Sequence, residues 1–286
     1  MQVRVSKRQS RRSSGGGKDK GPIFKPDGQG QISQKIRGEF MPDKACEELT
    51  AEGIVLYNEE RYAEALEKFT LAANEGCAEA CYMLGEAYCN GNGVKRSGAI
   101  GSEWHEKAAK KGYIPAQMKL GIYFHFGRGN LEADKKKACY WMKKAAQVGN
   151  SEAQCWVGLF YLWGYFGKKD AKTALLWFHR AAQQNNPDGL YEIGSCYEHG
   201  EGVEKDLKKA IEWYEKAAAR DSGEALCRLG HCYRYAWGVE QDIPLAVQYY
   251  ESAAELDEPD AWDCLDELSA KGYMEAKEAL SRLKGE

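Results

Sequence analysis

The sequence predicts an all-α fold, a right-handed α-solenoid (an α/α superhelix) of about six stacked helix-turn-helix repeats. Two series of small residues predict this fold, because each recurs at an almost constant spacing. Ala-Ala pairs return every 36 or 37 residues, at Ala72/Ala73, Ala108/Ala109, Ala145/Ala146, Ala181/Ala182, Ala217/Ala218 and Ala253/Ala254. Glycines keep the same spacing, each followed three positions later by an aromatic residue, at Gly85, Gly121, Gly158, Gly194 and Gly230. One repeat is therefore about 36 residues long.

The copy at residues 190–220 shows how one repeat is built from two amphipathic helices. Its first helix places Leu190, Ile193 and Tyr197 on one face, with the i, i+3, i+7 spacing of a helix that packs on one side. Gly194 lies in the middle of this helix, where a glycine costs about 1 kcal/mol unless it allows close packing against another helix. We therefore expect close packing at all five phased glycines.

A polar residue that can cap a helix recurs before the second helix of each repeat. A glycine such as Gly200 ends the first helix, and the side chain of Asp206 can then accept hydrogen bonds from the free amide groups of the second helix. A small residue follows each cap after four positions, and an aromatic residue follows after three more. The five predicted caps are Ser97, Asp134, Asp170, Asp206 and Asp242.

These motifs carry a family resemblance. The segments LGEAYCNGNGV (84–94), LGHCYRYAWGV (229–239) and AIEWYEKAA (210–218) are similar to the consensus of the Sel-one-like repeat family, a relative of the tetratricopeptide repeat with a longer loop. The resemblance covers about residues 43–286 and implies a solenoid with a concave side. It says little about function, because the family includes proteins of signalling, secretion, degradation and host–microbe contact.

The repeats divide the chain into units. We expect a disordered basic tail at residues 1–42, a tetratricopeptide-like repeat with a shorter turn at 43–77, and capping helices at 257–286. A solenoid needs distinct terminal units because its end faces have no neighbour. Between these units we expect five Sel-one-like repeats, at 78–112, 113–149, 150–185, 186–220 and 221–256.

The charges separate a basic tail from an acidic body. Residues 1–40 hold 10 of the 40 Lys and Arg residues and 3 of the 43 Asp and Glu residues, so the tail has a charge of +7 and the remainder −10. Because phosphate backbones attract basic surfaces, we expect no nucleic-acid binding by the folded body. Ser14 follows Arg11 and Arg12, a pattern that a basophilic kinase would phosphorylate, although a solubilising or vector-derived extension explains the tail equally well.

The sequence also predicts a cellular location. The N-terminus lacks the apolar run of a secretory signal, and the longest apolar stretch, residues 158–167, is about half of the length that spans a bilayer. In a cysteine-rich branch of the family, cysteines eight residues apart pair, but here Ala73 stands where the partner of Cys81 would be. We therefore expect reduced thiols, no membrane span and a cytoplasmic, reducing compartment.

No catalytic motif is present, so we expect no enzyme. A Gly-rich phosphate loop, H-E-x-x-H and G-x-S-x-G are absent, and the one S-x-x-K, from Ser281 to Lys284, lacks its companion motifs. An alternative hypothesis is a metal- or thiol-dependent, redox-sensing protein that uses the Cys and His residues of repeats four and five. Cys227 and His231 share a helix face, but His199 would have to converge on them, so the main prediction has no metal and no cofactor.

The resemblance to tetratricopeptide repeats places a concave groove at fixed positions around each phased glycine. These positions are three residues before the glycine, one after it, and four or five after it. They predict a scaffold or adaptor that binds a peptide or protein segment in the groove, although packing of the same side chains under the loops would also explain them. The predicted groove residues are Tyr82; Ile122, Phe126, Leu159 and Trp163, which form an apolar anchor; and Tyr191, His199, His231, Arg234 and Tyr235.

Overall fold

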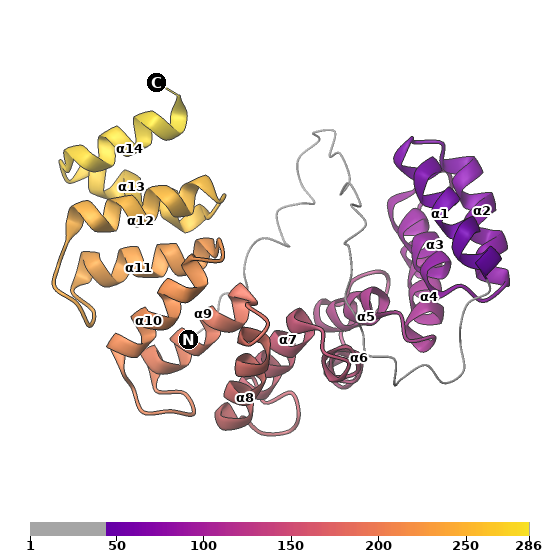
Figure 1. Cartoon of the computed structure of the whole chain (residues 1–286), viewed down its shortest axis with the longest axis horizontal. Coiled ribbons are helices and arrows are strands. Elements are labelled where there is room, and N and C mark those ends of the chain that lie inside the picture. The colour runs from indigo at the N-terminus through magenta and orange to yellow at the C-terminus, as the bar shows by residue number, and fades with distance from the viewer. Residues whose placement is uncertain (1–43, 286) are drawn as a thin grey trace.

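The computed structural model describes residues 44–285, and within this range every regular element is an α-helix. The helices pack in sequence as antiparallel pairs, α1 with α2 through α13 with α14, which confirms the predicted all-α solenoid (Figure 1). The predicted basic tail and Ser14 lie outside the described residues. The helices are α1 (Lys44–Asn58), α2 (Tyr62–Asn74), α3 (Ala78–Asn90), α4 (Gly98–Lys110), α5 (Ile114–Phe126), α6 (Lys135–Gln147), α7 (Ser151–Leu162), α8 (Ala171–Ala182), α9 (Pro187–His199), α10 (Leu207–Ala218), α11 (Gly223–Tyr235), α12 (Ile243–Glu255), α13 (Pro259–Ala270) and α14 (Met274–Lys284).

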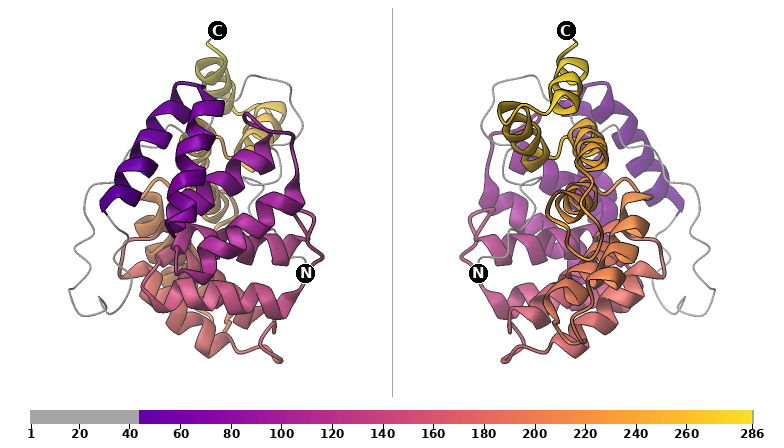
Figure 2. Two further views of the ribbon diagram at one scale, coloured as in Figure 1. Left: turned by 90° about the vertical axis from the view of Figure 1, so that its right-hand side faces the viewer. Right: turned by 90° about the vertical axis from the view of Figure 1, so that its left-hand side faces the viewer.

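The helical pairs follow one another along an arc. Figure 1 shows α1 to α4 at one end and α11 to α14 at the other, with α5, α7 and α9 on the inner side and α6, α8 and α10 on the outer side. Figure 2 looks at the arc from its two ends, with the N-terminal helices nearest in one view and the C-terminal helices nearest in the other. No helix among the described residues is long and apolar enough to cross a membrane.

Each phased glycine lies against a large side chain from the second helix of its own pair. A Cβ atom added to Gly194 would lie 2.6 Å from the ring of Tyr214 and 3.1 Å from the carbonyl oxygen of Ala210. These separations are shorter than van der Waals contact, so only glycine fits without a shift of its neighbours. The expected close packing is confirmed. The side chains that cover Gly85, Gly121, Gly158, Gly194 and Gly230 are His105, Met142, Phe178, Tyr214 and Tyr250, and Phe69 covers Gly53 of the first pair in the same way.

The five predicted caps are all confirmed. The side chain of Asp206, for example, accepts a hydrogen bond from the amide of Lys209, as expected of a residue that begins a helix. The backbone amide of each cap residue also donates a hydrogen bond of 2.8–3.0 Å to the carbonyl of the aromatic residue that follows the phased glycine. In the clearest repeat this bond joins Asp206 to Tyr197. In all five repeats the cap residue thus joins the loop to both helices, through its backbone amide to the first and through its side chain to the second.

The terminal hairpins differ from the repeats between them. In the first pair, α1 and α2 are joined by a short turn, and Gly53 still lies against Phe69. In the last pair, the exposed Asp266 occupies the position of the phased glycine. The surfaces where the two helices of each terminal pair meet are nevertheless buried. Phe69 in the first pair and Leu265 and Leu268 in the last are almost inaccessible to solvent.

Candidate interaction surface

The ten predicted groove residues differ in how far solvent can reach them. Tyr82 and Arg234 are buried, with 9% and 4% of their surface exposed, so packing is their first role. His199 and Tyr235 are exposed. The remaining six are partly buried: Ile122, Phe126, Leu159, Trp163, Tyr191 and His231.

The predicted apolar anchor packs against its own hydrophobic core. Ile122, Phe126, Leu159 and Trp163 all lie on the buried cluster formed by α5 to α8. His125 lies between two of them, stacked on Trp163 at 5.4 Å between ring centroids and edge-on to Phe126 at 4.3 Å. Burial lowers the pKa of His125, which keeps its ring neutral within this aromatic group. A Trp163→Ala variant would therefore lose packing contacts in the core as well as side-chain surface that a partner could contact.

A more open apolar surface lies at the C-terminal end of α11. Tyr235 and Trp237 are 46% and 37% exposed, and their rings stack at 5.3 Å. The ring of His231 lies 6.0 Å from Tyr235 and 6.3 Å from Trp237. We call His231, Tyr235 and Trp237 the aromatic patch. Trp237 was not among the predicted groove residues because it follows the helix, after Ala236 in the left-handed conformation, and folds back toward His231.

A polar network lies beside this patch and joins three helices. The carboxylate of Glu198 on α9 accepts hydrogen bonds from the hydroxyl of Tyr214 at 2.6 Å and from Nε of Arg228 at 3.0 Å. A second guanidinium nitrogen of Arg228 lies 2.9 Å from the other carboxylate oxygen. The Arg228 guanidinium also lies 5.9 Å from the Trp237 ring. The network therefore fixes α11, and with it the aromatic patch, relative to α9 and α10.

Acidic side chains gather where α9 meets its neighbours. Burial raises the pKa of Glu192 to about 8, and the charges of Asp188, Glu201 and Glu224 add to this effect. Ionised Glu192 is therefore unfavourable in the folded chain.

We expect Glu192→Gln to stabilise the protein in a pH-dependent way. The folded-state pKa is above the unfolded value of about 4.3, so wild type loses stability as the pH rises from about 4 to about 8. Glutamine cannot ionise, and the variant should gain ~1–3 kcal/mol at pH 8.5 but almost nothing at pH 4. Urea unfolding at the two pH values measures this difference. An equal gain at both would show that the charge of Glu192 does not matter.

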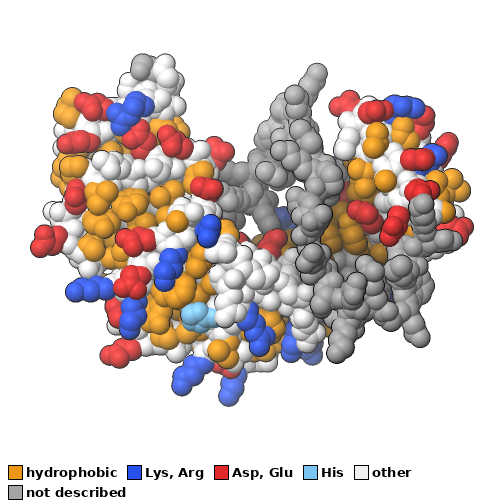
Figure 3. All heavy atoms as spheres, viewed as in Figure 1, with side chains coloured by type: hydrophobic (Ala, Val, Ile, Leu, Met, Phe, Trp, Pro, Cys, Tyr) orange, Lys and Arg blue, Asp and Glu red, His pale blue; other side chains and the backbone are white. Residues whose placement is uncertain are grey.

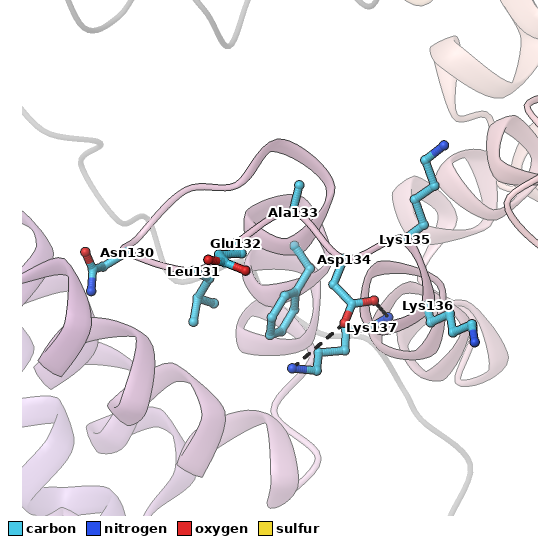
Figure 4. A pocket seen from close by; sticks show the side chains of 9 residues that line it. Asn130, Leu131, Glu132, Ala133, Asp134, Lys135, Lys136 and Lys137 are labelled. Carbon is cyan, nitrogen blue, oxygen red and sulfur yellow. Dashed lines mark hydrogen bonds and ion pairs between the residues drawn. The ribbon is translucent and has the colours of Figure 1, made fainter.

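A pocket at the loop between α5 and α6 is formed by residues of the capping motif. Figure 4 shows Asp134 and Lys137 side by side, 3.9 Å apart, among the residues from Asn130 to Lys137. The carboxylate of Asp134 also caps α6 by accepting a hydrogen bond from the Lys137 amide at 3.0 Å. Asp134, an acidic residue beside the lysines of this pocket, thus serves the helix cap.

The structure brings together a different Cys and His set from the one considered in the sequence. Cys227 and His231 do share a face of α11, with 3.9 Å between Sγ and Nε2. The third residue beside them is Cys264 of α13, whereas His199 hydrogen-bonds to the carbonyl of Ser195. Cys264 was missed because it lies in the terminal hairpin, where the repeat pattern is lost.

Comparison with known proteins gives a consistent result. The Sel1 repeat matches the chain five times, at residues 78–113, 114–150, 151–186, 187–222 and 223–258. The structure of a Sel1 repeat protein from Oxalobacter formigenes is 29% identical, with a TM-score of 0.72, over 82% of this chain and 99% of that one.

Two further solved structures are similar. A protective antigen of uropathogenic Escherichia coli with an SLR fold is 30% identical, with a TM-score of 0.65; the match covers 77% of this chain but only 48% of the antigen. An immunity protein of Pseudomonas aeruginosa is 16% identical, with a TM-score of 0.50, over 77% of this chain and 85% of that one, and this likeness shows the fold alone.

Proposed function

The chain belongs to the Sel1 repeat family, and on this premise we propose that it is a non-catalytic interaction scaffold that binds a peptide or protein segment. The inner side of the arc, where α5, α7 and α9 lie, is one surface that such a segment would follow (Figure 1). The bound segment would contact several repeats at once, since three successive repeats each place a helix on this side.

The aromatic patch is the observation that carries this proposal. Tyr and Trp side chains dominate binding energy in protein interfaces because they bury a large area at a small entropic cost. Here Tyr235 and Trp237 are exposed, stacked on each other and held next to the Glu198–Arg228 pair. Figure 3 shows hydrophobic side chains gathered around α11 and α12 on one face of the arc. An aromatic surface beside a fixed charged pair suits a segment with apolar and polar side chains.

We expect the double variant Tyr235→Ala, Trp237→Ala to lose the bound partner while keeping its fold. Loss of an interface hot spot costs about 2 kcal/mol or more, which is roughly a 30-fold weaker affinity. Proximity labelling with wild type and variant, quantified by mass spectrometry, identifies proteins whose recovery depends on the patch. The dissociation constants of these proteins for purified wild type and for the purified variant then give the loss of affinity.

The matched control is Leu176→Ala on the outer helix α8. Leu176 is 63% exposed, more than either aromatic residue, so its removal tests whether any exposed apolar side chain has the same effect. Binding should be unchanged in this control. If the aromatic variant keeps every interaction of wild type, or if Leu176→Ala loses the same ones, the aromatic patch is not the binding surface.

A further inference from the structure

Three soft donor atoms converge where α11 meets the terminal hairpin. The Sγ atoms of Cys227 and Cys264 and a ring nitrogen of His231 all lie within 4.8 Å of one another. We propose that this group binds one Zn²⁺ ion and so connects the last full repeat to the capping helices. The inference does not depend on the proposed adaptor function.

The geometry is close to that of a zinc site. Zn–S bonds of about 2.3 Å and Zn–N bonds of about 2.0–2.1 Å in a tetrahedron place the donor atoms roughly 3.5–3.8 Å apart. The distance from Cys227 Sγ to His231 Nε2 is 3.9 Å, and no two of the three donor atoms lie more than 4.8 Å apart, so side-chain movements of about 1 Å would complete the arrangement. Three protein ligands leave the fourth position for water.

The position of the His231 ring is fixed by a buried tyrosine. Nδ1 of His231 lies 2.9 Å from the hydroxyl of Tyr250, a residue with no exposed surface. When Nδ1–H donates to this hydroxyl, the lone pair of Nε2 is available on the side of the ring that faces Cys227. A hydrogen bond from the second ring nitrogen is the usual support of a metal-bound histidine. The Tyr250 ring can lie there because Gly230 has no side chain.

The charge balance also favours a divalent ion. Zn²⁺ displaces one proton from each thiol, so the ion and two thiolates form a neutral group and two protons are released. A neutral group suits this place, since Cys227 and Cys264 are only 6% and 9% exposed.

The test uses the full chain, purified without a His tag, reduced, and stripped of metal with a chelator. We expect calorimetric titration with Zn²⁺ to show one ion per chain, and Co²⁺ to give the charge-transfer absorption of a thiolate-bound ion. Cys264→Ser should weaken Zn²⁺ binding at least 100-fold, while Cys89→Ser, which changes a partly buried thiol far along the chain, should leave it unchanged. Circular dichroism checks that both variants are folded.

A second variant separates ligand positioning from simple packing. Tyr250→Phe keeps the ring and removes only the hydroxyl that holds His231, and should weaken Zn²⁺ binding about 10–100-fold. The proposal is wrong if wild type binds no Zn²⁺, if Cys264→Ser binds as tightly as wild type, or if thiol titration of the unreduced protein shows Cys227 and Cys264 joined as a disulfide. A metal-free result would leave the adaptor function untouched, because its test depends on Tyr235 and Trp237.

Discussion

Glu198→Ala should destabilise the protein by about 3 kcal/mol, the largest loss that we expect from a single substitution. The carboxylate accepts hydrogen bonds from Tyr214 and Arg228, and its removal leaves a fully buried tyrosine hydroxyl and a largely buried guanidinium without this partner. An unpaired buried charge costs more than the pair itself contributes. Guanidinium unfolding followed by circular dichroism measures the change.

The control is a carboxylate–arginine pair of the same geometry whose arginine lies at the surface. Glu251 accepts two hydrogen bonds from Arg282, at 2.7 and 2.8 Å, but the Arg282 side chain is 59% exposed. Water can replace this partner, so Glu251→Ala should change the free energy of unfolding far less than Glu198→Ala. Equal losses in the two variants would mean that burial of the Glu198 network does not contribute to stability.

Gly194→Leu should also destabilise the solenoid, by roughly 2–3 kcal/mol. The new side chain would meet the ring of Tyr214 and the backbone of Ala210, and Tyr214 cannot move away without losing its hydrogen bond to Glu198. Helix propensity predicts the opposite sign, since replacing glycine within a helix stabilises it by up to about 1 kcal/mol. The direction of the change therefore decides between packing and propensity.

Ala63→Leu is the matched control for this substitution. Ala63 is exposed on α2, so leucine there adds the same kind of side chain without meeting a neighbouring helix. Its effect on the melting temperature should be small. A Gly194→Leu protein that melts at or above the wild-type temperature would show that the phased glycines do not mark close helix contacts.

Features that depend on neighbouring residues could be predicted from the sequence. The phased glycines, the helix caps and the paired helices all follow from short spacings that repeat along the chain, and repetition separates them from chance. The resemblance to Sel-one-like repeats was confirmed for the same reason. Cap geometry is especially predictable because a side chain such as that of Asp206 reaches an amide only three residues away.

Features that depend on the angle between repeats could not be predicted in this way. Tyr82 and Arg234 occupy groove positions in the consensus, yet Tyr82 packs on Tyr113 at the start of the next repeat and Arg234 pairs with Glu267 of α13. Cys264 of α13 lies beside Cys227 of α11, a neighbour that only the packing of the last hairpin against repeat five supplies. The spacing of a repeat gives each residue its place in a helix, but it does not give the partner that a neighbouring repeat supplies there.

The contact between each phased glycine and its covering side chain has a consequence for how such a chain can evolve. Both partners lie in one hairpin, as Gly158 and Phe178 do, and so do the cap and the carbonyl that close its loop. A duplicated stretch of about 36 residues thus inherits a complete set of internal contacts. Descendants of such a duplication can lengthen the arc by a whole hairpin at once, and later mutations on the inner side can diverge without first repairing the fold.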